Sequence, residues 1–248
     1  MFAGKSISVV IPAYNEEHYV ASTLSSIPRF VDQIIVVDDH STDGTLDRIT
    51  AAQDSRLVIL RHSANLGVGR AIATGYRRAL ASGADLICVM GADGQMDPEE
   101  LPSLIRPILK NRALYTKGNR LVHPELLENM PWIRVIGNIG LSVMTKLASG
   151  YWHICDSQCG YTVITREALQ LLDLNALYDR YGYPNDLLAK LNIHDIPVAD
   201  VPIRPIYHHN HSGIKIIRAL FFMNFVLARS FIYRLWHKYL APSGGDAQ

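Results

Sequence analysis

The stretch VMGADGQMDPEE, residues 89–100, places carboxylates, an amide and two glycines directly after a strand-like apolar run. Asp97 followed by Pro98 and two glutamates is typical of a helix start, because Asp caps a helix, Pro suits its first position and Glu complements the helix dipole. Asp93 and Gln95 come earlier, on a glycine-flanked loop. Their oxygens could bind a hard divalent cation that bridges phosphates, although Asp before Gly is also ordinary turn chemistry.

Short apolar runs and helical stretches alternate through the first half of the chain. The runs at residues 7–14, 33–39, 56–62 and 85–93 predict strands buried on both faces, and the stretches at 16–27, 44–53, 67–83 and 98–112 predict helices. This alternation predicts an α/β fold with a mainly parallel sheet. Ligands bind at the carboxyl ends of such strands, so the loops PAYNEE, DDHSTDGT and GADGQMD should line one crevice. The first strand lacks a following G-x-G-x-x-G, which argues against a dinucleotide-binding dehydrogenase.

Composition narrows the class of protein. The 248 residues, 48% of them hydrophobic, suit one large domain or one domain with an appendage. The balance of 24 basic against 23 acidic residues argues against nucleic acid as the main partner. Three cysteines are too few for a disulfide framework and, without a signal-peptide cleavage pattern, predict a reduced, cytoplasmic environment. Because no uncharged apolar run reaches the ~18 residues of a spanning helix, we expect no membrane crossing.

Six motifs resemble one enzyme family when they are taken in order. They are VVIPAYNEE, VDDHSTDGT, NLGVGRAIATG, GADGQMDPEEL, YTKGNRL and DSQCGYT. Each is weak alone, but their order resembles glycosyltransferase family 2, in particular its dolichol-phosphate mannose synthase-like branch, over residues 7–212. The resemblance implies a GT-A fold, which is a Rossmann-like, mainly parallel sheet flanked by helices. It also implies inverting transfer of a hexose from a UDP- or GDP-sugar.

The resemblance assigns the nucleotide-sugar donor to residues of the predicted crevice and the helix after it. These are Pro12, Ala13, Tyr14, Glu16, Asp39, Gly69, Arg70 and Asp93. Asp39 would read the base, because a carboxylate accepts the N–H groups of uracil or guanine. Turn formation in DDHSTDG is the alternative role for Asp38 and Asp43, and it is favoured for Asp43. Thr162 stands where the mannose synthases usually carry arginine, which leaves the diphosphate contact and the donor sugar open.

The metal motif departs from the family pattern at Gly91, where the family carries the first acid of Asp-x-Asp. Asp93 and Gln95 match the remaining metal positions, so the resemblance implies a Mg²⁺ or Mn²⁺ site with one carboxylate fewer. We therefore expect the metal to bind appreciably only together with the sugar nucleotide, whose diphosphate completes its ligands.

Two acceptors are compatible with this resemblance. A phosphate acceptor needs cations, and Arg120 and Arg134 match arginines that hold the lipid phosphate of a polyprenyl (dolichyl or undecaprenyl) phosphate. Asp156 matches a segment near the acceptor. A hydroxyl acceptor would instead need a general base, for which Asp186 in GYPNDLL is the candidate. A third alternative is an inactive sugar-nucleotide-binding or membrane-scaffold protein that lost activity through Gly91.

Two acid-free segments, residues 129–149 and 213–240, could bring the protein to its lipid substrate. The second contains Phe, Tyr and Trp with five cations, which suits helices lying on an anionic membrane surface. The alternative is packing on the core or between subunits of a homo-oligomer. We expect a catalytic domain at 1–212 that includes the interfacial helix at 129–149. An amphipathic helix segment at 213–240, a flexible tail at 241–248 and a peripheral position on the cytoplasmic face complete this prediction. His208, His209 and His211 are interpreted as a polar loop rather than as metal ligands.

Overall fold

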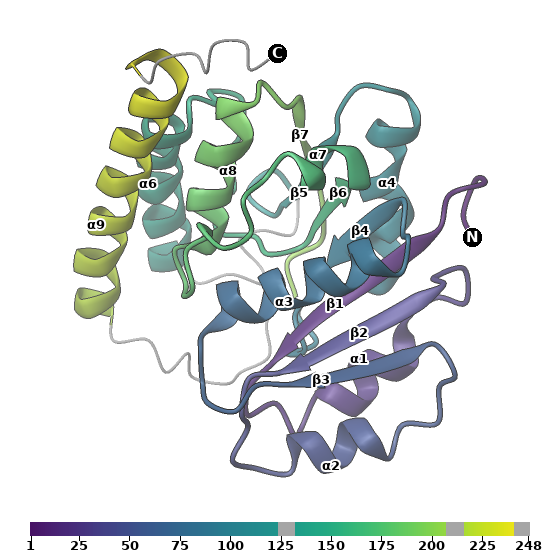
Figure 1. Ribbon diagram of the computed structural model, residues 1–248. Helices are drawn as coiled ribbons and strands as arrows, with labels where there is room; N and C mark the ends of the chain where they lie inside the picture. Colours follow the sequence, from purple (N-terminus) through teal and green to yellow (C-terminus); the bar gives the residue numbers. More distant parts are fainter. Residues whose placement is uncertain (124–131, 207–215, 241–248) are drawn as a thin grey trace, which may run out of the picture.

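The computed structural model describes residues 1–123, 132–206 and 216–240 (Figure 1). At residues 132–134, 138 and 216–222 it describes the backbone alone. The segment with His208, His209 and His211, the boundary expected at residue 212 and the tail 241–248 lie outside the described residues.

The first half of the chain forms the four strands predicted from its apolar runs. They are parallel neighbours, β1 (Ile7–Ala13), β2 (Gln33–Asp38), β3 (Leu57–Arg61) and β4 (Leu86–Val89). The connecting helices are α1 (Val20–Ser26), α2 (Thr45–Thr50) and α3 (Val68–Ala81). Nearly every side chain of β1, β2 and β4 is buried, as expected for strands covered on both faces. The same prediction was wrong for β3, which lies at the edge of the sheet and is only partly buried.

Three further strands complete a seven-stranded sheet in the order β3-β2-β1-β4-β6-β5-β7. They are β5 (Tyr115–Asn119), β6 (Thr162–Thr165) and β7 (Val198–Pro202). β6 is antiparallel to both β4 and β5, whereas β5 and β7 are parallel. β5 therefore runs in the same direction as β1, β2 and β4, and Arg120, which follows it, lies at the edge of the sheet where those strands end.

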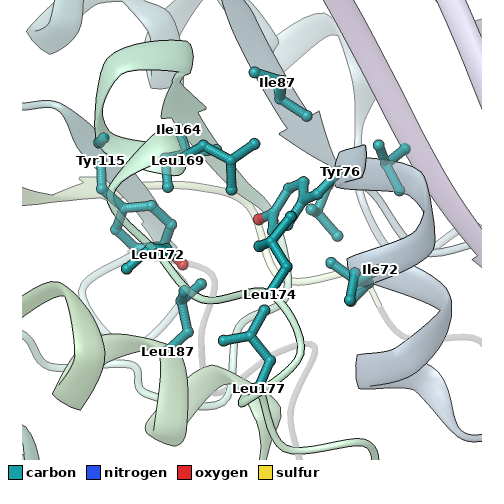
Figure 2. Close-up of a cluster of buried hydrophobic side chains, with 14 of the residues drawn as sticks. Ile72, Tyr76, Ile87, Tyr115, Ile164, Leu169, Leu172, Leu174, Leu177 and Leu187 are labelled. Atoms are coloured by element: carbon teal, nitrogen blue, oxygen red, sulfur yellow. The ribbon is translucent and has the colours of Figure 1, made fainter. Parts of the chain in front are cut away.

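Helices cover both faces of the sheet and define two hydrophobic cores. On one face lie α1, α2, the 3₁₀ turn η1 (Pro98–Glu100) and α4 (Leu101–Leu109), whose Leu101, Leu104 and Ile105 are fully buried. On the other lie α3, α7 (Arg166–Gln170) and α8 (Tyr183–Ile193). Figure 2 shows this second core, with Tyr76 of α3 between side chains of the sheet and the segment before α8. The result is the expected three-layer α/β arrangement.

Two long helices, α6 (Trp132–Ser149) and α9 (Ile216–Leu235), pack on each other and on α8 at one side of the molecule (Figure 1). α9 continues into the π-helical turn η2 (Trp236–Leu240). The Arg234 guanidinium donates to the Ala148 carbonyl at 2.9 Å and the Leu147 carbonyl at 3.2 Å, so it caps the end of α6. None of the helices in the described part of the chain combines the length and apolar character needed to cross a bilayer.

Candidate active site

The predicted crevice is present as a cavity of about 510 Å³ at the carboxyl ends of β1, β2 and β4. Six residues expected to contact the donor line it: Pro12, Ala13, Tyr14, Glu16, Asp39 and Asp93. They come from three loops that are far apart in the sequence and that the parallel strands bring to one edge. The size suits a small-molecule ligand.

Asp39 lines this cavity, and hydrogen bonds to both of its carboxylate oxygens fix its position. Its carboxylate accepts hydrogen bonds from the backbone N–H groups of Leu66 at 2.9 Å and Gly67 at 2.7 Å. The Nδ1 atom of His62 lies 2.7 Å from Oδ1, and Nε2 of the same ring lies 3.0 Å from the Thr74 hydroxyl. These contacts orient the carboxylate, but they also occupy part of its accepting capacity. Its role in reading the base stays a prediction.

The remaining acids of the nucleotide loops divide into turn residues and cavity residues. Asp38 accepts from Ser41 N at 3.1 Å, and Asp43 accepts from Thr45 N at 3.0 Å, so both stabilise the loop after β2. Glu16 and Asp93 instead face the cavity. Burial, together with the negative charges of Asp93 and Asp43, raises the pKa of Glu16 to about 7.

Asp93 lies against the space that Gly91 leaves. A Cβ added at residue 91 would be 2.9 Å from Asp93 Oδ1. The same Oδ1 accepts from Gln95 N at 3.1 Å, while Gln95 itself is absent from the residues that line the cavity. Two residues later, Asp97 accepts from Glu99 N at 3.0 Å and caps η1, as predicted. The two acids of this loop therefore have different roles: Asp93 lines the cavity, and Asp97 caps the following helix.

Near the loop after β4 the cavity offers two carboxylates, Glu16 and Asp93, so a divalent cation there would need a ligand to supply most of its remaining oxygens. Glu16 and Asp93 both line the cavity, and a cation there would offset the repulsion that contributes to the raised pKa of Glu16. Within the described residues, no group of three or more His, Cys, Asp or Glu side chains converges on one point. Asp93 would hold Mg²⁺ or Mn²⁺, and the contribution expected from Gln95 stays a prediction.

Gly69 and Arg70 lie beside the cavity, outside its lining. Their N–H groups at the start of α3 donate to the Asp179 carbonyl, at 2.7 and 3.2 Å, and the Arg70 guanidinium pairs with the Asp179 carboxylate at 2.8 Å. Both residues thus hold the segment before α8. Direct contact with the nucleotide stays a prediction for them.

Arg120 and Asp156 form a buried pair just beyond the end of β5. Arg120 Nε and Nη2 donate to the two Asp156 oxygens at 2.8 and 3.1 Å, and Asp156 is completely buried. Burial raises the pKa of the Asp156 carboxyl, but Arg120 and Lys117 outweigh it, so the pKa is lowered overall. Lys117 is also fully buried and donates to the Cys159 carbonyl. Asp156 thereby fixes the orientation of Arg120 after β5, and neither residue is among those that line the cavity.

Asp186 has the environment of a structural carboxylate rather than that of a general base. It is almost completely buried in the first turn of α8, away from the cavity lining. One oxygen accepts from Lys190 Nζ at 2.5 Å and Tyr178 N at 2.9 Å, and the other accepts from the Ser230 hydroxyl at 3.1 Å. These donors leave the carboxylate little capacity to take a proton from a substrate.

Two other predicted features are only partly described. Arg134 lies in the first turn of α6, but its side chain is outside the described residues. Thr162 is buried in β6 and does not line the cavity. Thr162 is therefore not placed to contact a diphosphate in this cavity, and such a contact would have to come from other residues.

Comparison with known proteins identifies the family. Residues 8–172 match the sequence profile described as Glycosyl transferase family 2. The chain belongs to glycosyltransferase family 2. The predicted family and the predicted GT-A fold are thus confirmed, and the protein is a glycosyltransferase.

Three relatives of this glycosyltransferase act on polyprenyl phosphates according to their names. UDP-N-acetylglucosamine–dolichyl-phosphate N-acetylglucosaminyltransferase of Methanococcus voltae is 32% identical over 83% of this chain and 87% of its own length. Polyprenol monophosphomannose synthase of Mycolicibacterium smegmatis is 30% identical over 86% and 83%. Undecaprenyl-phosphate mannosyltransferase of Micrococcus luteus is 30% identical over 79% and 82%.

Solved structures share the fold of this glycosyltransferase. Glucosyl-3-phosphoglycerate synthase of Mycobacterium tuberculosis, in complex with Mn²⁺, UDP and phosphoglyceric acid, superposes with a TM-score of 0.68. It is 24% identical and covers 98% of this chain and 81% of its own. A second structure of the same enzyme contains Mg²⁺ and UDP. At this identity the likeness shows the fold alone.

Sequence reasoning missed the polar lining residues Asn65, Arg180 and Tyr181 of this glycosyltransferase's cavity. It also did not assign the small and apolar lining residues Gly67, Val68, Ala71, Gly91 and Ala92 to the donor. Asn65 begins the motif NLGVGRAIATG. The motif therefore predicted the correct segment, but the residues chosen from it, Gly69 and Arg70, do not line the cavity. Arg180 and Tyr181 directly precede GYPNDLL. They lie more than 150 residues after the first strand, whose end also lines the cavity. Only tertiary packing brings them to the cavity, and no local motif announces it.

Proposed function

We propose that this glycosyltransferase moves a hexosyl unit from a UDP- or GDP-sugar to a polyprenyl phosphate, with inversion at the sugar carbon. The observation that carries the proposal is the likeness, at 30% identity or more over about four fifths of the chain, to three enzymes named for polyprenyl phosphates. The cavity at the carboxyl ends of β1, β2 and β4 would hold the donor.

Arg120 supports a phosphate acceptor in preference to a hydroxyl. A phosphate is already ionised near neutral pH, so it needs positioning and charge compensation rather than a base. Asp156 holds the planar guanidinium in one orientation through two hydrogen bonds. An oxygen of the acceptor phosphate would attack the sugar carbon from the side opposite the diphosphate. The partners of Asp186 give no matching support to the hydroxyl alternative.

A divalent cation at Asp93 would supply charge neutralisation for the donor diphosphate. The chain's own contribution is to place Asp93 at the cavity, with Glu16 beside it, on the loop that Asp97 fixes to the following helix. We propose that the cation binds appreciably only with the sugar nucleotide, because Gly91 contributes no carboxylate.

The lipid acceptor implies contact with a membrane, and exposed apolar side chains of α6 and α9 support it. Ile139 and Val143 on α6 and Phe225 and Ile232 on α9 are each at least half exposed. The cations contribute less than the sequence suggested, since Arg234 caps α6 and Lys238 pairs with Asp195 at 2.5 Å. We propose peripheral attachment at the cytoplasmic face, with a homo-oligomer interface as the competing role for these helices.

The test is transfer from a panel of labelled UDP- and GDP-sugars, with Mg²⁺ or Mn²⁺, into undecaprenyl or dolichyl phosphate. Label that appears in the organic phase and is released by mild acid would support the proposal and identify the donor. Parallel reactions contain 3-phosphoglycerate in place of the lipid. Transfer only to that soluble acceptor, or hydrolysis of a donor without transfer to lipid, would contradict it. No binding of any UDP- or GDP-sugar would favour the inactive-protein alternative.

A further inference from the structure

The segment of residues 178–183, here named the strap, forms one wall of the donor cavity. It contributes Arg180 and Tyr181 to the lining. Its Asp179 carbonyl accepts two N–H groups from the first turn of α3, and its Tyr183 N donates to the Arg180 carbonyl at 2.9 Å. The strap is therefore a fixed part of the site, although it lies far from the other cavity residues in sequence.

Two glycines allow the strap to lie directly on α3. A Cβ added at Gly67, where φ is +100°, would come within 2.5 Å of the Asp179 carbonyl oxygen and within 2.8 Å of the Arg180 Cγ atom. A Cβ added at Gly69 would come within 2.0 Å of the Tyr178 carbonyl oxygen. The contacts with the two carbonyl oxygens are closer than any Cβ tolerates, so only glycine at positions 67 and 69 lets the strap pack on the start of α3.

A second anchor holds the same, N-terminal end of the strap. Tyr178 N donates to Asp186 at 2.9 Å, and the Arg229 guanidinium of α9 lies 5.7 Å from the centre of the Tyr178 ring. α3, Asp186 and Arg229 thus hold Tyr178 and Asp179, while the Tyr183 N–H donates to the Arg180 carbonyl. The backbone at Arg180 is therefore fixed beside the cavity.

The charges of the cavity explain what Arg180 does there. Glu16, Asp39 and Asp93 all line it, while Arg180 is the one Lys, Arg or His among the described lining residues. A nucleoside diphosphate adds at least two negative charges. Arg70 does not line the cavity and Thr162 carries no charge, so neither residue is placed to offset the negative charges of the diphosphate.

We propose that Arg180 binds the diphosphate of the donor and stabilises it as the leaving group, an inference that rests on the proposed function. In the transfer, an acceptor phosphate oxygen forms a bond to the sugar carbon. The bond from that carbon to the β-phosphate oxygen breaks, and its electron pair stays on the nucleoside diphosphate. The Arg180 guanidinium donates two hydrogen bonds to phosphate oxygens as this charge develops.

The experiment compares nucleotides with nucleosides on Arg180→Gln. Calorimetry with Mg²⁺ measures the Kd of UDP, GDP, uridine and guanosine for the wild type and the variant. Losing a charge-assisted bidentate contact should weaken nucleoside diphosphate binding by ~10–100-fold. The Kd of the matching nucleoside should stay within about twofold, since it has no phosphate for arginine to bind. Arg180→Lys, which keeps the charge without the planar fork, should fall between the two.

A matched control is Arg77→Gln on α3, where Arg77 donates to Asn175 at 2.7 Å on the exposed surface. It makes the same change of charge and should leave all four affinities unchanged. Equal weakening of nucleoside and nucleoside diphosphate in Arg180→Gln would overturn the inference, because it would show a role in the shape of the strap alone. No weakening of either would also overturn it. A wild type that binds neither UDP nor GDP would instead refute the proposed donor class.

Discussion

Asp93 and Asp97 lie four residues apart on one loop, and the contacts of each predict a different consequence of its loss. Asp93 faces the cavity, whereas Asp97 caps η1 through Glu99 N at 3.0 Å. Asp93→Ala should lower kcat/KM for metal-dependent transfer by ~100-fold or more with little effect on stability. Asp97→Ala should cost about 1 kcal/mol of unfolding free energy and leave kcat/KM nearly unchanged. Initial rates and urea unfolding of both variants test this pair, and the reverse pattern would refute our division of the loop.

Glu16 predicts a pH dependence of stability in metal-free protein. Its folded pKa of about 7 exceeds the ordinary 4.5, so the folded state binds its proton more tightly than the unfolded state does. This contribution is complete below pH 4.5 and is lost as pH rises towards 7. The Gln side chain of Glu16→Gln stays neutral at every pH. The unfolding free energy of the variant should therefore rise relative to that of the wild type by about 1–2 kcal/mol as pH increases from 5 to 8, after allowance for solvent screening.

Urea unfolding of both proteins in chelator-treated buffer measures this difference. Asp32→Asn offers a control, because Asp32 lies at the opposite end of the sheet from the cavity and pairs with the N-terminal amine at 2.7 Å. A constant difference between wild type and Glu16→Gln across this pH range would show that the Glu16 carboxyl is solvated normally.

At the scale of elements, Asp186 joins α8, α9 and the strap. Asp186→Asn leaves the Lys190 ammonium buried without its counter-charge and should destabilise the protein by ~3–5 kcal/mol. Adding Lys190→Met removes that unpaired charge, and the Asn oxygen can still accept from Tyr178 N. We expect the double variant to regain most of the stability and to retain transfer to polyprenyl phosphate. Thermal unfolding and kcat measure the two effects separately.

The same double variant decides the role of Asp186 in catalysis. If Asp186 were a general base, a stable Asp186→Asn/Lys190→Met protein would lose transfer by ~10²–10⁴-fold and lose the acidic limb of its pH–rate profile. Retained transfer with an unchanged profile would exclude that role.

The elements differ in how far the sequence determines them locally. β1 to β4 follow from short apolar runs, and in β1, β2 and β4 the side chains are buried on both faces. β5 reads YTKGN, and its buried Lys117 is tolerated only because the Cys159 carbonyl, Asp156 and Asp200 surround it. The hydrophobic periodicity of a segment contains no information about such partners, which are distant in the sequence. For the same reason the sequence located the loops after β1, β2 and β4, but not the strap.

At the scale of the whole molecule, α6 and α9 present an apolar face whose partner decides how the enzyme meets its substrate. Ile232 on α9 is 66% exposed and Ile139 on α6 is 50% exposed, whereas Val226 and Leu227 on the packed side of α9 are buried. Burial of one such side chain contributes ~1.5–3 kcal/mol, which corresponds to ~10-fold or more in partition. Ile232→Glu should therefore reduce flotation with vesicles that contain anionic lipid and undecaprenyl phosphate by about that factor.

Leu171→Glu is the matched control, because Leu171 is 50% exposed and follows α7, away from α6 and α9. With a water-soluble short-chain polyprenyl phosphate, Ile232→Glu should transfer sugar as fast as the wild type, since its defect concerns access to the membrane and not chemistry. Flotation that is insensitive to Ile232→Glu, together with a change in molar mass by light scattering, would assign this face to a subunit interface. Because a membrane and a second subunit would compete for the same side chains, the two measurements together distinguish a protein that binds lipid directly from one whose dimer covers this face.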